Sequence, residues 1–227
     1  IPAAQCVRND AALEPPRAAL LVTGSNMSGK STYLRSLGLL SVMALAGLPV
    51  CAKSAKLSAL RVHTSMRISD ALEQGMSHFY AELVRPKSLV PAAHAGEPVL
   101  FLLDEILHGT NSRERSIGAQ AVVLDLVERG AIGAVSTHDF ALVSIAESSE
   151  GRVVPVHFSD RIEHGKMCFD YTMRPGVVQS TNAIRLMKLV GIDVDYALGS
   201  GEPRDGETDG RGEVESGRGR GERAPSE

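Results

Sequence analysis

The sequence predicts an α/β fold in which a mostly parallel sheet is flanked by helices. Two observations point to it. Short runs of apolar residues alternate with longer stretches of helical spacing along residues 18–190. The runs are apolar at successive positions rather than at every second one, which is typical of strands buried on both faces of a parallel sheet. Strands that alternate with helices favour parallel pairing, because each helix returns the chain to the edge where the next strand begins.

The first strand and the first helix are the most clearly marked elements. Residues 18–23 form an apolar run that ends at a glycine, and helical spacing follows over residues 31–46, closed by Gly47 and Pro49. The apolar stretch 37–50 is about 14 residues long, shorter than the ~20 that a membrane-spanning helix needs. We therefore expect a buried helix here and no contact between this chain and a membrane.

The remaining elements continue the alternation along the chain. We expect strands at residues 57–68 (one or two), 98–103, 131–137, 153–158 and 167–173, and helices at residues 76–95, 112–129, 140–146 and 181–190. The last two strands are expected to pair antiparallel, because only a short connection with turn residues at 163–165 separates them.

Charge is distributed unevenly between the body of the chain and its tail. The 227 residues carry a formal net charge of −3, from 24 Lys and Arg against 27 Asp and Glu. Residues 199–227 hold 8 of the acids, 5 arginines and almost no apolar side chain, so we expect a disordered tail. Residues 1–198 are neutral and are expected to form one domain. A neutral body excludes a strongly basic nucleic-acid protein of the histone kind.

Aromatic and cysteine content excludes further classes of protein. The chain has 5 Phe, 4 Tyr and no Trp, too few for a single-strand binder built on base stacking. Its 3 cysteines are far apart and in no paired spacing, which argues against a disulfide framework or a zinc site. No signal peptide is recognisable, so a reducing, cytoplasmic location is expected.

Residues 24–31, called the phosphate loop below, fit the pattern G-x-x-x-x-G-K-[ST] at every fixed position. Glycines let successive backbone N–H groups point into one concavity, and the following helix adds the positive end of its dipole, so the loop can hold nucleotide phosphates. Lys30 would reach the β- and γ-phosphates, and the Ser31 hydroxyl would bind Mg²⁺. A glycine-rich turn without a ligand is disfavoured, because the pattern lies between a strand and a helix. The nucleotide-binding candidates are Gly24, Ser25, Asn26, Met27, Ser28, Gly29, Lys30, Ser31 and Thr32.

Two carboxylates and a histidine follow later strands. Asp104 and Glu105 end the run 100–103, at the edge where ligands of parallel sheets bind. Asp104 would hold Mg²⁺ through Ser31 or a water, and Glu105 would orient the attacking water. His138 would donate a hydrogen bond to the γ-phosphate or to that water. Two adjacent acids after a strand are ordinarily only the start of a solvated loop, and a lone histidine at a strand end is ordinarily polar surface. Beside the phosphate loop, however, these three side chains predict hydrolysis of the bound nucleotide. A small-molecule kinase would not need Glu105.

Four segments carry a resemblance to a known family. They are Asn9-Asp10 with the phosphate loop, residues 67–79, residues 104–112 and residues 136–138. The phosphate loop and the three later segments are similar, in this order, to T-G-P-N-M-G-G-K-S-T-Y-x-R, R-I-G-A-x-D-x-L-x-x-G-x-S-T-F, D-E-x-x-R-G-T-S-T and A-T-H. These are patterns of the ATPase domain of the MutS family of DNA mismatch-repair proteins. Because they occur in the family's order, the resemblance is specific.

The resemblance implies a P-loop NTPase of the ABC-like type that works as a homodimer. In this family each ATP site is completed by a loop of the other subunit, which here would be Gly109, Thr110, Asn111 and Ser112. Asn and Ser are also favoured as helix N-caps, and both roles can hold together. Tyr171 would stack on adenine, and residues 70–79 would relay the nucleotide state to DNA-binding parts outside this chain. The helix at 181–190 would join the dimer contact.

Several positions depart from the family's patterns. Ser25 and Ser28 replace Pro and Gly in the phosphate loop, changes that need not disturb phosphate binding. Residues 111–112 read Asn-Ser instead of Ser-Thr, and residues 113–115 read Arg-Glu-Arg where the repair enzymes have Tyr-Asp-Gly. Cys6 stands where an aromatic side chain often packs on adenine, so base stacking would be one-sided. The family's mismatch-reading Phe-x-Glu is absent from this chain, which is closer to divergent bacterial MutS-like proteins.

We therefore expect a Mg²⁺-dependent ATPase and dimerisation domain that hydrolyses ATP and drives changes in DNA-binding domains outside this chain. Two alternatives remain. One is a nucleotide-gated dimerisation module with weak or no ATPase activity; the intact candidate residues argue against it, but Asn111 leaves room for it. The other is an ATPase of the transporter (ABC) or SMC type, which is disfavoured because the string L-S-G-G-Q does not occur.

Overall fold

The computed structural model describes residues 6–66, 89–107, 111–163 and 166–177. These residues build a six-stranded sheet in the order β2-β3-β4-β1-β5-β6. The strands are β1 (Ala19–Thr23), β2 (Arg61–Ser65), β3 (Val99–Asp104), β4 (Ile132–Thr137), β5 (Val153–Glu163) and β6 (Lys166–Pro175). Every neighbouring pair is parallel except β5 with β6, which is antiparallel. The predicted α/β fold with a mostly parallel sheet is confirmed.

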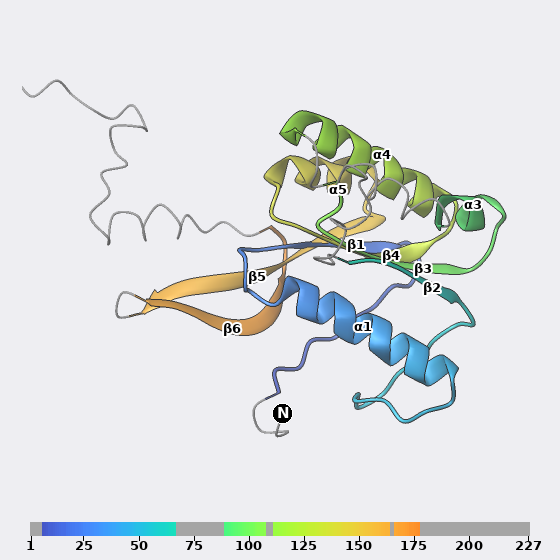
Figure 1. The fold of residues 1–227 in the computed structure, drawn as a ribbon, viewed down its shortest axis with the longest axis horizontal. Coiled ribbons are helices and arrows are strands. Elements are labelled where there is room, and N and C mark those ends of the chain that lie inside the picture. The colour runs from blue at the N-terminus through green and yellow to red at the C-terminus, as the bar shows by residue number, and fades with distance from the viewer. Residues whose placement is uncertain (1–5, 67–88, 108–110, 164–165, 178–227) are drawn as a thin grey trace, which may run out of the picture. The chain divides into compact units, whose positions relative to one another are not determined.

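Helices cover both faces of this sheet (Figure 1). On one face lies α1 (Lys30–Leu45), and on the other lie α3 (Leu89–His94), α4 (Ser112–Glu128) and α5 (Ser144–Ser148), with the 3-10 helix η4 (Phe140–Val143) leading into α5. The core is divided in the same way, because successive side chains of a strand point to opposite faces. Leu21 belongs to the cluster that contains Val123 of α4, whereas Leu20 belongs to the cluster that contains Leu34 of α1.

Most predicted elements are confirmed to within a residue or two. Where one or two strands were expected at residues 57–68, the described part has one, β2. Two elements differ. Residues 140–146 begin as a 3-10 helix. β5 runs on to Glu163, well past its apolar run, because its second half pairs only with β6 at the edge of the sheet.

Some predicted segments lie outside the described residues. The helix at 76–95 is described only from Leu89 onward, and the helix at 181–190 and the tail at 199–227 are not described. The chain divides into two compact units, residues 1–186 and 187–227, of which the second is outside the described part. The predicted boundary between residues 198 and 199 therefore stays a prediction.

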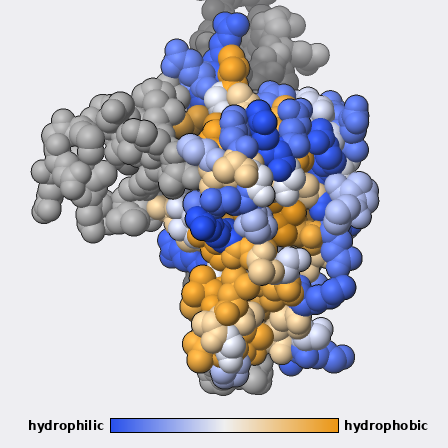
Figure 2. All heavy atoms as spheres, turned by 90° about the vertical axis from the view of Figure 1, so that its right-hand side faces the viewer, coloured by the Kyte–Doolittle hydropathy of each residue, from blue (hydrophilic) through white to orange (hydrophobic). Residues whose placement is uncertain are grey.

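The expectation of a buried helix over residues 37–50 is wrong for one side of α1. The helix meets the sheet along a narrow line, where a Cβ on Gly38 would lie 2.9 Å from Leu102 Cδ1. On its outward side the exposed fractions are 62% for Leu39, 52% for Val42 and 43% for Leu45. Figure 2 shows the right-hand side of Figure 1, where the C-terminal end of α1 lies, and apolar side chains gather on this side. A single helix layer covers this face of the sheet, so the outward apolar row stays exposed among the described residues.

Within the described residues, no helix combines the length and the apolar character needed to cross a membrane. The three cysteines all lie in described segments, and none of them is in a disulfide in the structure.

Candidate functional site

The carboxyl ends of β1, β3 and β4 meet at one edge of the sheet. β4 lies between the other two, so that Asp104 of β3 stands beside Ser136, and Thr23 of β1 stands beside Thr137. The phosphate loop leaves β1 at this edge and runs directly into α1. Strand register thus brings together the loop, the two acids and the histidine that the sequence analysis singled out.

The phosphate loop has a backbone that only glycine accommodates at its two ends. Gly24 has φ of 144° and Gly29 has φ of 109°, both in the region that L side chains rarely adopt. A Cβ on Gly24 would also lie 2.7 Å from the Phe158 carbonyl oxygen. Between them, Met27 has φ of 68° and is 83% exposed. The loop therefore forms a tight backbone curve with its tip open to solvent, which is the shape that phosphate binding by N–H groups requires.

Lys30 spans this loop with its side chain. Its Nζ donates to the carbonyl oxygens of Gly24 and Ser25, at 2.9 Å each, and the residue is 5% exposed. Burial lowers the pKa of Lys30, and the charges of Glu105 and Asp104 oppose that shift. A buried ammonium held in this way is poorly solvated, so a phosphate anion in the loop would supply the counter-charge.

Ser31 and Asp104 are in direct contact, as expected of two ligands of one magnesium ion. Ser31 Oγ donates to Asp104 Oδ1 at 2.9 Å. The hydroxyl of Ser136 donates to the same carboxylate oxygen. A hydroxyl and a carboxylate are the oxygen ligands that Mg²⁺ takes, with phosphate oxygens and water completing its shell. The described residues contain no group of three or more His, Cys, Asp and Glu side chains suited to a metal.

Glu105 and His138 face each other across the ends of β3 and β4. His138 Nδ1 lies 3.2 Å from Glu105 Oε1, and the side chains are 42% and 12% exposed. Glu105 has φ of 51°, a left-handed conformation that costs a non-glycine residue about 1–2 kcal/mol. Its N–H donates to both the carbonyl oxygen and the hydroxyl of Ser136, which offsets that cost. Strain of this kind gathers at functional sites.

Tyr171, on β6, lies against the end of the phosphate loop that leads into α1. A Cβ on Gly29 would lie 3.3 Å from Tyr171 Cδ1, so the ring stands directly against the end of the loop. The residue is 47% exposed, and its ring stacks on Phe169 at a centroid distance of 6.1 Å. Cys6 is exposed.

The segment predicted to reach the other subunit is only partly described. Gly109 and Thr110 lie outside the described residues, as does the segment 67–79. Asn111 is the N-cap of α4, and its Oδ1 accepts from the backbone N–H of Glu114 at 2.9 Å. The capping role expected of this position is confirmed.

Two contacts near the site were not anticipated from the sequence. Ser136 belongs to the Ser-Thr-His segment, but only the strand register shows that it holds Asp104. Arg115 Nε lies 3.8 Å from Asp139 Oδ2, both side chains are less than 20% exposed, and the pair joins the first turn of α4 to the turn after His138. The replacement of the family's Gly by Arg at position 115 was visible, but nothing in the sequence pairs that position with Asp139.

Comparison with protein families matches residues 20–196 to MutS domain V. The chain belongs to the MutS family. The matched range includes the phosphate loop, Asp104, Glu105, His138 and the β5–β6 hairpin. Similar proteins include the DNA mismatch repair protein MutS of Lactobacillus delbrueckii subsp. bulgaricus, 33% identical over 194 residues, with 85% of this chain and 22% of that protein covered.

Two further MutS-family proteins show the same extent of similarity. The DNA mismatch repair protein MutS of Brevibacillus brevis is 36% identical over 186 residues, with 81% of this chain and 21% of that protein covered. That of Streptococcus pneumoniae is 34% identical over 177 residues, with 77% and 21% covered. The chain spans about a fifth of the length of these MutS relatives.

Proposed function

We propose that this chain is the ATP-binding and ATP-hydrolysing domain of a MutS-family protein, with a phosphate-loop fold of the ABC-like type. The observation that carries the proposal is the convergence of Lys30, Ser31, Asp104, Glu105 and His138 at one edge of the sheet. The tight loop between Gly24 and Gly29 supports the phosphate-binding part of it. Membership of the MutS family supports ATP as the nucleotide.

Each residue has a role that its surroundings favour. Loop N–H groups and Lys30 would bind the phosphates, and Ser31 and Asp104 would hold Mg²⁺. Bound Mg²⁺ would neutralise charge on the β- and γ-phosphate oxygens. Glu105 would orient the attacking water and accept its proton. His138, at 3.2 Å from Glu105, would hold that carboxylate in place and donate to the γ-phosphate side of the site.

Dimerisation and DNA coupling belong to the same proposal. We infer from the family that two copies associate through this domain, with residues 109–112 of one copy completing the site of the other. Turnover would then change the DNA-binding parts of a longer protein, since the relatives extend far beyond the region that matches this chain. A cytoplasmic location stays a prediction.

The test separates binding from turnover. Lys30→Ala is expected to lose ATP affinity, whereas Glu105→Gln is expected to retain ATP and lose turnover by roughly 100- to 10,000-fold, as for loss of a general base. Binding is measured by calorimetry and turnover by phosphate release, with Glu128→Gln, an exposed acid at the end of α4, as the matched control. Normal turnover in Glu105→Gln removes that residue from its role. Binding without turnover in the wild-type chain favours a nucleotide-gated dimerisation module instead.

The two-subunit site has its own test. Lys30→Ala protein is mixed with a variant that carries Asn111→Ala and Ser112→Ala, so that one mixed dimer contains one undamaged site. The mixture is expected to regain activity that neither variant shows alone. A mixture no more active than its components would mean that the site is not shared between subunits.

A further inference from the structure

Strand β6 carries a bulge beside the phosphate loop. In its register with β5, Ser159 alone stands opposite residues 170–172 of β6. In the middle of this bulge Tyr171 has φ of 54°, a left-handed conformation that a non-glycine residue rarely adopts. Such a conformation persists only where neighbouring groups hold it.

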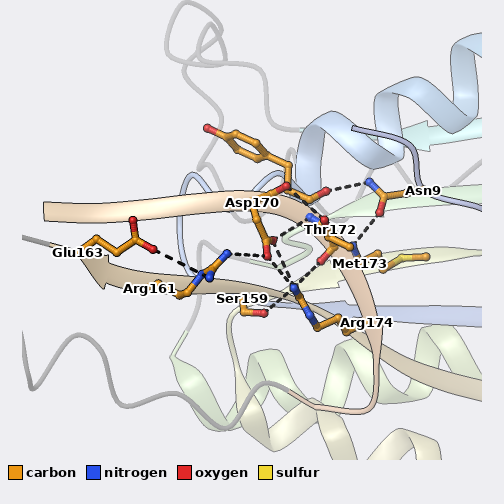
Figure 3. A network of polar contacts seen from close by, with 9 residues as sticks. Asn9, Ser159, Arg161, Glu163, Asp170, Thr172, Met173 and Arg174 are labelled. Carbon is orange, nitrogen blue, oxygen red and sulfur yellow. Dashed lines mark hydrogen bonds and ion pairs between the residues drawn. The ribbon is translucent and has the colours of Figure 1, made fainter. Parts of the chain in front are cut away.

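Asn9, in the segment before β1, holds the backbone directly after the Tyr171 Cα, on both sides of Thr172 (Figure 3). Its Nδ2 donates to the Tyr171 carbonyl oxygen at 2.9 Å, and its Oδ1 accepts from the Met173 N–H at 2.7 Å. Both ends of the amide are therefore bonded to β6. The first of these hydrogen bonds fixes the carbonyl group of the left-handed Tyr171 itself, and the second fixes the strand two residues further on.

Asp170 and Arg174, both on β6, stabilise the bulge by hydrogen bonds within the hairpin. The Asp170 carboxylate accepts from Arg174 Nη2 at 2.6 Å and from the Thr172 N–H at 3.0 Å. These hydrogen bonds, that of Arg174 first, lower the pKa of Asp170 to about 2. Arg174 also donates to Ser159 Oγ of β5 at 2.9 Å (Figure 3). This network shapes the bulge, while Asn9 ties it to the segment before β1.

That segment is itself fixed to the helix that begins at the phosphate loop. The Tyr33 hydroxyl of α1 donates to the Asp10 carbonyl oxygen at 3.2 Å. Asn9 thus connects β6 to a stretch of chain that the first turn of α1 holds. The connection explains how the Tyr171 ring keeps its place against Gly29 with nearly half its surface open.

We propose that Asn9 is a positioning residue that holds the Tyr171 ring beside the phosphate loop, where the ring meets the base of a bound nucleotide. The proposal rests on the proposed function. Without the amide, Tyr171 would relax toward extended backbone, and because side chains alternate along a strand its ring would turn away from the loop. Contact with a flat base would weaken, while contacts with phosphates would stay.

The experiment compares a ligand that has a base with one that has none. Binding of ATP and of inorganic tripolyphosphate, each with Mg²⁺, is measured by calorimetry on the whole chain. Asn9→Ala is expected to weaken ATP binding about 5- to 10-fold, the lower end of what base stacking contributes. Tripolyphosphate affinity is expected to change less than about twofold. Gln120→Ala, which removes a half-buried amide on α4 that donates to Ser148 Oγ, is the matched control.

A double-mutant cycle distinguishes positioning from a separate contribution. Asn9→Ala combined with Tyr171→Ala is expected to bind ATP as Tyr171→Ala alone does, since the amide acts through the ring. Asn9→Asp, which keeps the acceptor for the Met173 N–H and loses the donor, is expected to show the same ATP-specific loss. It serves as the second variant if Asn9→Ala unfolds.

Three results would overturn the proposal. They are equal losses for ATP and tripolyphosphate, additive effects in the cycle, and unchanged ATP affinity in both Asn9 variants. If the wild-type chain binds both ATP and tripolyphosphate and one of these three results is found, ATP binding stands and the positioning role is wrong. If the wild-type chain binds neither ligand, nucleotide binding itself is wrong and the positioning role falls with it.

Discussion

The sheet edge that carries Lys30 and Asp104 and the hairpin that carries Tyr171 are built in different ways. At the edge, strand register sets the positions, as where Asp104 stands beside Ser136. In the hairpin, a bulge and the amide of Asn9, 162 residues away in sequence, hold the ring. The residues proposed to bind phosphates are therefore positioned by short segments at strand ends, and the ring proposed to meet the base is positioned by a tertiary contact between the two ends of the described chain.

This difference makes the two sides separable by mutation. A change at the sheet edge should affect every ligand that carries phosphates, with or without a base. A change in the hairpin should affect the base alone, or the stability of the hairpin. The following predictions, from the largest expected effect to the smallest, use that contrast.

The largest effect is expected for Gly24→Ala on the phosphate side. An alanine Cβ would lie 2.7 Å from the Phe158 carbonyl oxygen, at a φ of 144° that alanine resists, so the loop must shift. A strain of about 3 kcal/mol corresponds to a loss of roughly 100-fold in affinity. Calorimetry should show this loss for ATP and tripolyphosphate alike. An ATP-specific loss would break the separation between the two sides.

Ser136→Ala is expected to have the next largest effect. The hydroxyl that donates to Asp104 and accepts from the Glu105 N–H is removed, leaving both groups less firmly held. Loss of such a supporting hydrogen bond typically costs 10- to 100-fold in metal affinity or activity. The measurement is phosphate release as a function of Mg²⁺ concentration. Ser36→Ala, which removes an exposed hydroxyl of α1, should behave as wild type, and a Ser136→Ala protein with unchanged Mg²⁺ dependence would contradict the role.

On the hairpin side, Asp170 makes stability depend on pH. Its pKa is lowered from 3.8 to about 2 in the folded chain, so the ionised form stabilises the fold above about pH 4, and that contribution is lost as the pH falls toward 2. Asp170→Asn should lower the melting temperature at neutral pH and flatten its pH dependence between about 4 and 2. Melting curves across this range check it. A variant as pH-sensitive as wild type would place the titration in another group.

The smallest effect is expected on the outward side of α1, away from both regions. Val42 is 52% exposed, so Val42→Ser should change the free energy of unfolding by no more than about 0.5 kcal/mol and leave ATP affinity unchanged. Urea unfolding measures the first quantity and calorimetry the second. A loss of several kcal/mol would show that the apolar row is covered in solution.

The fold was largely predictable because β1 and β3 are buried on both faces and read as apolar runs that end in a polar residue. The end of β5 was not, because its second half has only β6 as a neighbour and lacks such a run. The exposure of α1 was not either, since an apolar helix reads the same whether one side or both are covered. A sequence pattern shows which residues are apolar, but it does not show which element packs on them.

In the candidate site too, some residues belong to short sequence patterns and others are placed by tertiary structure. Lys30, Asp104 and Glu105 follow strands in recognisable short patterns, so their meeting at one edge was predictable from parallel pairing alone. Ser136 and Asn9 act through register and through a bulge, neither of which leaves a local pattern. Their roles became visible only when strand pairs and hydrogen bonds were known.

The position of β1 in the sheet has a consequence for how the protein is made. β1 lies between β4 and β5, and Ala19 pairs with Gly133 and Val153. A ribosome adding ~5–20 residues per second needs on the order of ten seconds to reach these partners after β1 has been synthesised. Throughout that time a strand that is fully buried in the folded protein has neither of its neighbours. Nascent chains of this protein should therefore depend on chaperones more than folds whose first strands pair with the next in sequence.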